Sequence, residues 1–281
     1  MINGILVILL CAIGSLAFAW VYFLHAEITR PPIGVTNMWD IIFMMAGILL
    51  IPYLYLLLPL WFVTALLFIE TASVIYFLFE PVVVAKIALW VLALGPALAD
   101  IAAATMYGVH SNVFYLINNL VLVLVVVGIS NLWAQGGMKA RHAAILAGYL
   151  AVYDFVFTAL LPVTDNLFAR LAGLPFAPMF AWSAGSEGQW LAIGLGDVLL
   201  AAVFPLVMLK AFGRRAGLLG MALALGVICV LLIFPSLGLL RAAFPVMVVL
   251  GPVMIAQYVL WLRRRGTERT ARQFATARQT Y

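Results

Sequence analysis

Residues 190–209 read WLAIGLGDVLLAAVFPLVML, a run of twenty residues in which Asp197 is the only charged side chain. About 20 apolar residues in an α-helix cross the hydrocarbon core of a bilayer. The whole chain has this character, because 67% of its 281 residues are hydrophobic and only 9% are charged. A soluble chain of this length needs a polar surface that such a composition does not supply. The sequence therefore predicts an all-α integral membrane protein.

Nine stretches are long and apolar enough to span a membrane. A single helix over residues 41–80 would rise about 60 Å, roughly twice the hydrocarbon thickness, so this run must turn. Pro52 and Pro59 are the available breakers, and we place the turn at Pro59. We expect one nine-helix transmembrane domain over residues 1–262, followed by a basic, disordered cytoplasmic tail over 263–281. The predicted spans are 3–24, 41–59, 61–80, 83–106, 112–133, 142–162, 189–210, 216–238 and 242–262.

The basic residues orient these spans. With the N-terminus outside, thirteen of the fifteen Lys and Arg residues fall on the inner side, and only Arg170 and Arg241 fall outside. Cytoplasmic loops carry such an excess, so we expect an outer N-terminus and a cytoplasmic C-terminus. The compact loops favour a prokaryotic plasma membrane. The arginines of the tail are typical of a cytoplasmic end next to lipid, and we expect no nucleic-acid partner.

The N-terminal helix raises the question of processing. Ala17-Phe18-Ala19 resembles a signal-peptidase site after an apolar run. However, no Lys or Arg precedes the run, and the run continues to Leu24. We therefore expect the first helix to be retained.

Two aspartates lie inside predicted spans, each within a short motif. Tyr153-Asp154 belongs to the sixth span and Gly194-Leu195-Gly196-Asp197 to the seventh. A carboxylate at membrane depth is costly and marks a functional site by default. Each aspartate lies eight residues from the outer end of its predicted span, which places both about 12 Å below the outer surface. Two carboxyl groups that meet there share one proton, and this is the chemical unit of aspartic proteolysis.

The other acidic and metal-binding residue types lack such motifs. We expect structural partners for Asp40, Glu70, Glu80 and Asp100, which lie in or near spans. The histidines show no ligand spacing, so the sequence indicates no metal site, and nothing in it indicates an organic cofactor.

The two motifs and their place in the span order resemble the presenilin and signal peptide peptidase family of intramembrane aspartyl proteases. In that family YD lies on the sixth of nine helices and GxGD on the seventh. The resemblance implies that Asp154 and Asp197 are catalytic and that Tyr153, Gly194, Leu195 and Gly196 flank them. An outer N-terminus is similar to signal peptide peptidase and opposite to presenilin. The implied substrates are single-span membrane proteins or signal peptides, cleaved within their transmembrane helices.

One motif of the family is altered. Pro-Ala-Leu begins helix nine in the family, and the nearest counterpart here is Pro245-Val246-Met247. The resemblance implies a substrate-positioning role for these three residues, with a changed shape that bears on substrate choice and activity. A literal Pro96-Ala97-Leu98 occurs in the fourth span, upstream of both aspartates, and we interpret it as coincidental.

The connection over residues 163–188 is rich in glycine, proline and bulky apolar side chains. One hypothesis is that it gates the site or pairs with an unwound substrate by strand addition. The alternative is an ordinary amphipathic loop on the membrane surface.

Three other functions remain open. A proton-coupled transporter also places paired acids beside glycines, although we find no inverted repeat in this chain. A prepilin-peptidase-like enzyme shares GxGD, and a catalytically impaired relative would act as a membrane scaffold.

Overall fold

The structure is a computed structural model that describes residues 2–28, 36–161, 163–183, 190–236, 245–269 and 273–274. Its described elements are ten α-helices, one π-helix (η1) and two strands. In chain order they are α1 (Ile2–His25), α2 (Met38–Leu57), α3 (Leu60–Phe79), α4 (Lys86–Tyr107), α5 (Asn112–Gln135), α6 (Ala140–Asp154), η1 (Phe155–Leu160), α7 (Val163–Leu171), β1 (Met179–Ser183), β2 (Trp190–Gly194), α8 (Leu195–Phe212), α9 (Arg214–Ser236) and α10 (Val246–Arg265).

Eight of the described helices are long and apolar enough to cross a membrane: α1 to α5 and α8 to α10. A ninth crossing is obtained only if residues 140–158 and α7, which are bent by 85° to one another, are counted as one broken span. The prediction of a multi-pass α-helical membrane protein is therefore confirmed. The predicted turn at Pro59 is also present, because α2 ends at Leu57 and α3 begins at Leu60.

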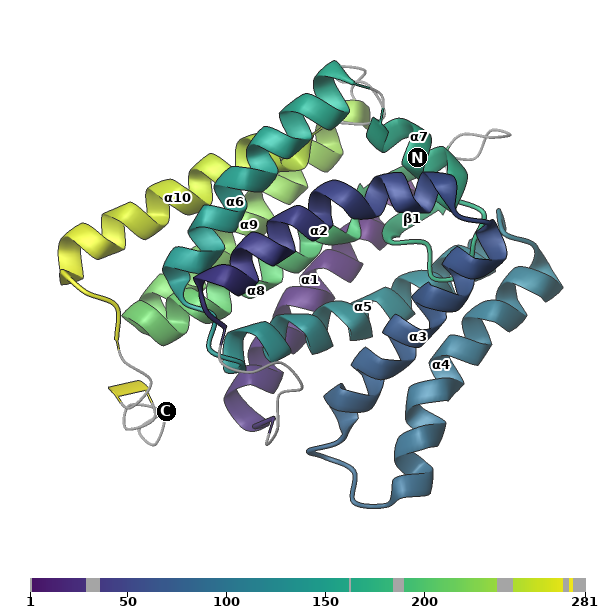
Figure 1. Ribbon diagram of the computed structural model, residues 1–281, viewed down its shortest axis with the longest axis horizontal. Coiled ribbons are helices and arrows are strands. Elements are labelled where there is room, and N and C mark those ends of the chain that lie inside the picture. Colours follow the sequence, from purple (N-terminus) through teal and green to yellow (C-terminus); the bar gives the residue numbers. More distant parts are fainter. Residues whose placement is uncertain are drawn as a thin grey trace.

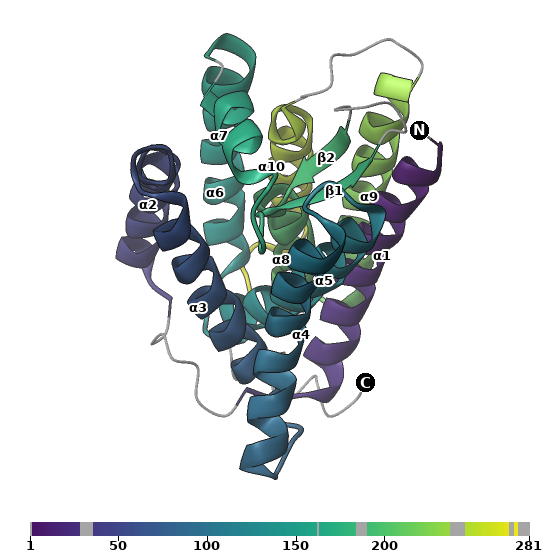
Figure 2. The same ribbon diagram turned by 90° about the vertical axis from the view of Figure 1, so that its right-hand side faces the viewer.

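The helices form three groups, and the middle group contains the most buried helix (Figures 1 and 2). In Figure 1, α3 and α4 lie on one side and α6, α9 and α10 on the other, with α1, α5 and α8 between them. Figure 2 shows α7, the strands and the start of α1 at one end of the bundle and the α3–α4 connection at the other. This arrangement places the segment that connects α6 to α8 at the same end of the molecule as the N-terminus.

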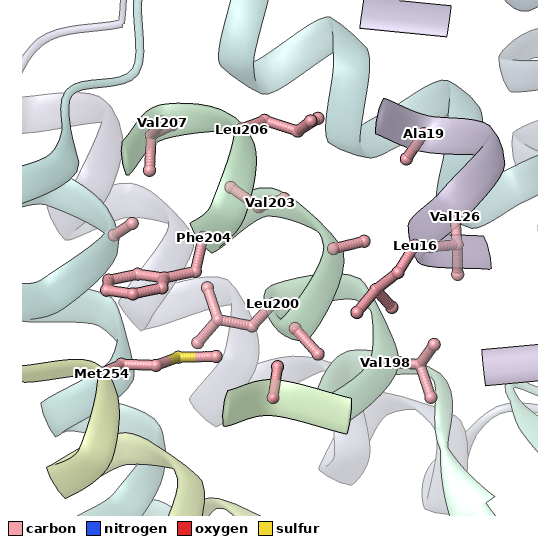
Figure 3. Close-up of a cluster of buried hydrophobic side chains, with 14 of the residues drawn as sticks. Leu16, Ala19, Val126, Val198, Leu200, Val203, Phe204, Leu206, Val207 and Met254 are labelled. Carbon is pink, nitrogen blue, oxygen red and sulfur yellow. The ribbon is translucent and has the colours of Figure 1, made fainter. Parts of the chain in front are cut away.

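The most buried helix is α8. In its apolar stretch 72% of the residues are buried within the protein, against 11% in α2. A helix that is hydrophobic all round is buried on every side, whereas α2 presents most of its surface to lipid. Figure 3 shows side chains of α8, such as Val203 and Phe204, meeting Leu16 of α1, Val126 of α5 and Met254 of α10. The helix that carries Asp197 is thus held from several directions.

Two predicted spans differ from the observed elements in the type of secondary structure, and the first is the span over residues 142–162. Its α-helical hydrogen bonding ends at Asp154, and residues Phe155–Leu160 form a π-helix before the chain turns into α7. π-Helical turns are rare and occur often at functional sites. The apolar composition of this stretch carries no signal for the change of helix type.

The second difference is that residues 190–194, predicted as the first turns of a helix, form strand β2. It pairs antiparallel with β1, from Met179 opposite Gly194 to Ser183 opposite Trp190. A short apolar run does not by itself distinguish strand from helix, and the glycines at 194 and 196 disfavour an earlier helix start. Asp197 consequently lies in the first turn of α8. The predicted depth of Asp197 below the outer surface assumed a helical rise from residue 189, and this assumption was wrong.

The C-terminal end of α10 also continues further than expected. The helix extends to Arg265, beyond the predicted limit of 262. The Glu268 carboxylate accepts hydrogen bonds from the Arg141 backbone N–H (3.0 Å) and the Tyr258 hydroxyl (3.1 Å), and the Arg269 N–H donates to the Ala211 carbonyl (3.1 Å). Residues 263–269 of the expected tail are therefore attached to the helix bundle. Residues 270–272 and 275–281 lie outside the described part of the chain.

Candidate functional site

A cavity of about 410 Å³ lies between α2, α3, α5, α6, α7 and α8. Its wall is mainly apolar, but it includes both motif aspartates, Asp154 and Asp197. The same wall contains Tyr153, Gly194, Leu195 and Gly196, so every residue of the two motifs borders one space. The two motif segments, which are far apart in the sequence, therefore border the same cavity.

Asp154 is the last residue of α6 before the π-helix. Its Oδ2 accepts a hydrogen bond from the backbone N–H of Met247 at 2.9 Å. Met247 lies in the first turn of α10, where backbone N–H groups have no partner within their own helix. The start of α10 thus provides a donor that fixes the Asp154 carboxylate.

Asp197 lies in the first turn of α8, close to Gly194, the residue that precedes that helix. The Gly194 backbone N–H donates a hydrogen bond to its carboxylate, and Asp154 is close enough for the two carboxyl groups to interact electrostatically. A Cβ atom at Gly194 would stand 3.0 Å from Asp197 Oδ2, which is closer than ordinary van der Waals contact. A side chain at position 194 would therefore force the Asp197 carboxylate to move by a few tenths of an ångström.

Gly196 has a different environment. A Cβ atom there would meet no atom within 4 Å among the described residues, and the residue borders the cavity. The first glycine of the motif thus accommodates Asp197 itself, whereas the second leaves free space next to it.

The altered Pro-Ala-Leu counterpart contacts the site through its backbone. Pro245 precedes α10, and the side chains of Val246 and Met247 are buried at 8% and 1% exposure. Within the described residues, none of these three side chains borders the cavity. Their contact with the site is the Met247 N–H on Asp154.

Sequence reasoning missed most of the cavity wall. Thr164, Leu167 and Phe168 of α7 border it, as do Phe176 and Pro178 of the segment between α7 and β1. These residues lie in the 163–188 connection that we singled out for its composition, but its helix and strand were not predicted. The sequence signal for this part of the wall was the number of bulky apolar residues in the connection, which is higher than a polar surface loop would contain.

The other intramembrane acids have separate places. Asp40 forms a capping box with Asn37 at the start of α2, and Asp100 accepts the Phe176 N–H at 2.7 Å, so structural partners are confirmed for both. Glu80 is exposed at the end of α3. Glu70 borders the cavity on the α3 side.

The comparisons with known proteins give no family. No protein-family model matches the chain, and no curated protein has a matching sequence.

Proposed function

We propose that this protein is an intramembrane aspartyl protease in which Asp154 and Asp197 form the catalytic pair. The observation that carries the proposal is that two carboxyl groups from separate apolar helices act on one another at the wall of one cavity. A carboxylate within the membrane is costly, and a second one beside it adds electrostatic repulsion. A purely structural role does not explain this additional cost.

The chemistry follows from the pairing. Two adjacent carboxyl groups hold one proton between them, so one is ionised while the other is neutral. The ionised group takes a proton from a water molecule, and the neutral group polarises the carbonyl of the peptide bond. The Met247 N–H on Asp154 and the Gly194 N–H on Asp197 stabilise the negative charge wherever it resides.

A transmembrane substrate must unwind before its peptide bond can be attacked. Extended backbone is tolerated at membrane depth only where protein or water satisfies its polar groups. The outer edge of β1 is already occupied, because the Asn119 amide pairs with both backbone groups of Ala181 (3.0 and 2.9 Å). The opposite edge of the sheet is the outer edge of β2. Among the described residues, the hydrogen bond found on this edge runs from the Gly194 N–H to the Asp197 carboxylate.

We propose that the unwound substrate adds to β2, which leads directly into the catalytic motif. A peptide substrate that carries N-methyl groups at alternate positions beside the cleaved bond should then be cut more slowly than its unmethylated form. Equal rates for the two peptides would contradict strand addition.

The test of the activity is cleavage of a single-span substrate in detergent by purified protein. Asp154→Asn and Asp197→Asn should each lower kcat by about 10³-fold or more, since each removes one member of a unit that acts jointly. Asp165→Asn is the matched control, because Asp165 is exposed on α7 and does not border the cavity. Cleavage that survives in both dyad variants would rule out this catalytic pair.

The rate should also pass through a maximum at mildly acidic to neutral pH, because activity needs one neutral and one ionised carboxyl group. A rate that rises steadily to about pH 10 would contradict a shared proton.

A second function is favoured by one observation. Asp154 stands where an α-helix changes to a π-helix and then bends by 85°, and transporters place their ion sites at such helix interruptions. Proton-linked uptake into liposomes by a protein that cleaves no peptide would establish a proton-coupled transporter instead.

A further inference from the structure

The segment over residues 174–178, between α7 and β1, turns sharply beside the cavity, and we call it the strap. Phe176 in this segment has φ of +63°, and no other described residue apart from glycine has a positive φ. This backbone conformation is unfavourable for a bulky side chain. The Phe176 ring is 1% exposed and packs against Phe68 of α3, with ring centroids 5.8 Å apart. The surrounding structure must therefore hold the turn in place.

Asp100 of α4 is the residue that holds it. Its Oδ2 accepts the Phe176 backbone N–H at 2.7 Å, and the residue is fully buried. Its other oxygen, Oδ1, has no hydrogen-bond partner in the part of the chain that the structure describes. A buried carboxyl group with one oxygen unpaired is unfavourable in an apolar helix. The hydrogen bond from the strained residue to Oδ2 offsets part of this cost.

The strap in turn contacts the catalytic motif. The Pro178 carbonyl accepts the Leu195 N–H at 2.9 Å, two residues before Asp197. That N–H belongs to the first turn of α8, where it has no partner within the helix. Asn118 of α5 donates from its amide to the Ala177 carbonyl at 3.3 Å. A continuous set of hydrogen bonds therefore joins α4 and α5, through the strap, to the start of α8.

We infer that Asp100 is a positioning residue for the site: by holding Phe176 in its left-handed turn, it fixes the Pro178 carbonyl and hence the start of α8 that carries Asp197. The inference rests on the proposed protease function. It assigns to the fourth span, which contains neither catalytic motif, a part in aligning the catalytic pair.

The role requires a hydrogen-bond acceptor at position 100 and not a charge. Asp100→Asn keeps an acceptor oxygen for the Phe176 N–H, so kcat should stay within about threefold of wild type. Asp100→Ala leaves this N–H without a partner. The start of α8 should then shift, and kcat should fall by roughly tenfold to a hundredfold, with KM changed much less. Recovery by the asparagine variant is a result that a requirement for negative charge would not give.

Thr105→Val is the matched control. Thr105 lies on the same helix and is exposed, and its hydroxyl bonds only to carbonyls of α4 itself at 3.0 Å. This variant loses hydrogen bonds of α4 without touching the strap, so its kcat should equal that of wild type. If Asp100→Ala reduces thermal stability while the folded protein keeps wild-type kcat, Asp100 is merely structural and the inference is overturned.

Hydrogen exchange provides a readout that does not depend on activity. Backbone amides over residues 176–183 and 194–197 should exchange faster in Asp100→Ala than in Asp100→Asn. If the alanine variant does not fold, Asn118→Ala releases the strap from α5 and should produce the same pattern of exchange and kcat. If wild type cleaves no substrate, the proposed function fails, and the exchange comparison alone decides whether Asp100 fixes the start of α8. Identical exchange in the alanine and asparagine variants would overturn the inference.

Discussion

At the scale of single residues, the two glycines of the Gly194-Leu195-Gly196-Asp197 motif have separable roles. Gly194→Ala would place a methyl group 3.0 Å from Asp197 Oδ2, so the carboxylate must move. We expect kcat to fall by about tenfold to a hundredfold, because small displacements of reacting groups have effects of this size. Gly196→Ala meets no described atom within 4 Å and should keep kcat. Its methyl group borders the cavity and should raise KM severalfold.

Steady-state kinetics on a single-span peptide measures both effects. Equal losses of kcat in the two alanine variants would contradict separate roles for the two glycines. Helix propensity would not explain such losses, because alanine is more favourable than glycine by about 1 kcal/mol within a helix.

Several site residues could be predicted from the sequence because charge is costly in lipid. Asp154 and Asp197 stand out for this reason together with their short motifs, and the structure brings them to one cavity. The Met247 N–H on Asp154 could not be predicted, since the two residues are 93 positions apart and the contact depends on how α10 packs on α6. The strained Phe176 was equally hidden, because nothing in its side chain favours a positive φ.

At the scale of elements, close packing of α10 on α6 sets the Met247 contact. A Cβ atom at Gly251 would stand 2.6 Å from the Ala147 carbonyl oxygen and 2.9 Å from the Ala151 Cβ. Gly251→Ala must therefore push the two helices apart, at a cost of about 1–3 kcal/mol, which is typical of overpacking. We expect a lower Tm in detergent and a lower kcat, because the donor to Asp154 moves with α10.

Gly226→Ala on α9 is the control for this prediction, since a Cβ atom there meets no described atom within 4 Å. It should leave the Tm unchanged or raise it slightly, as expected for alanine in a helix. A Gly251→Ala variant with wild-type Tm and kcat would show that the helices do not approach as closely as described.

The elements show where sequence patterns stop being informative. Long apolar runs and the proline at 59 predicted the helices α1 to α5 with ends within three residues of the observed ones. The run over residues 190–194 was assigned to a helix but pairs with β1 as a strand. Both stretches are apolar, so hydropathy does not distinguish them. Strand pairing with β1 decides the structure of residues 190–194, and the paired residues are seven to fifteen positions apart in the sequence.

At the scale of the whole molecule, the orientation in the membrane remains a prediction of the positive-inside rule. Lys86, Lys139, Arg214 and the arginines at the end of α10 should face the cytoplasm. The α3–α4 connection and the start of α1 lie at opposite ends of the bundle (Figure 2), so a reagent that does not cross membranes should distinguish the two ends.

Val84 in the α3–α4 connection is 99% exposed, and His110 between α4 and α5 is also exposed. With Cys11 and Cys229 replaced by alanine, Val84→Cys should react only in inverted vesicles and His110→Cys only in intact cells. A matched pair of this kind tests the orientation without any assumption about activity, because the two positions flank one helix. The opposite labelling pattern would place the end of the bundle that holds β2 at the cytoplasmic surface, so a substrate of the proposed protease would reach β2 from the inner side.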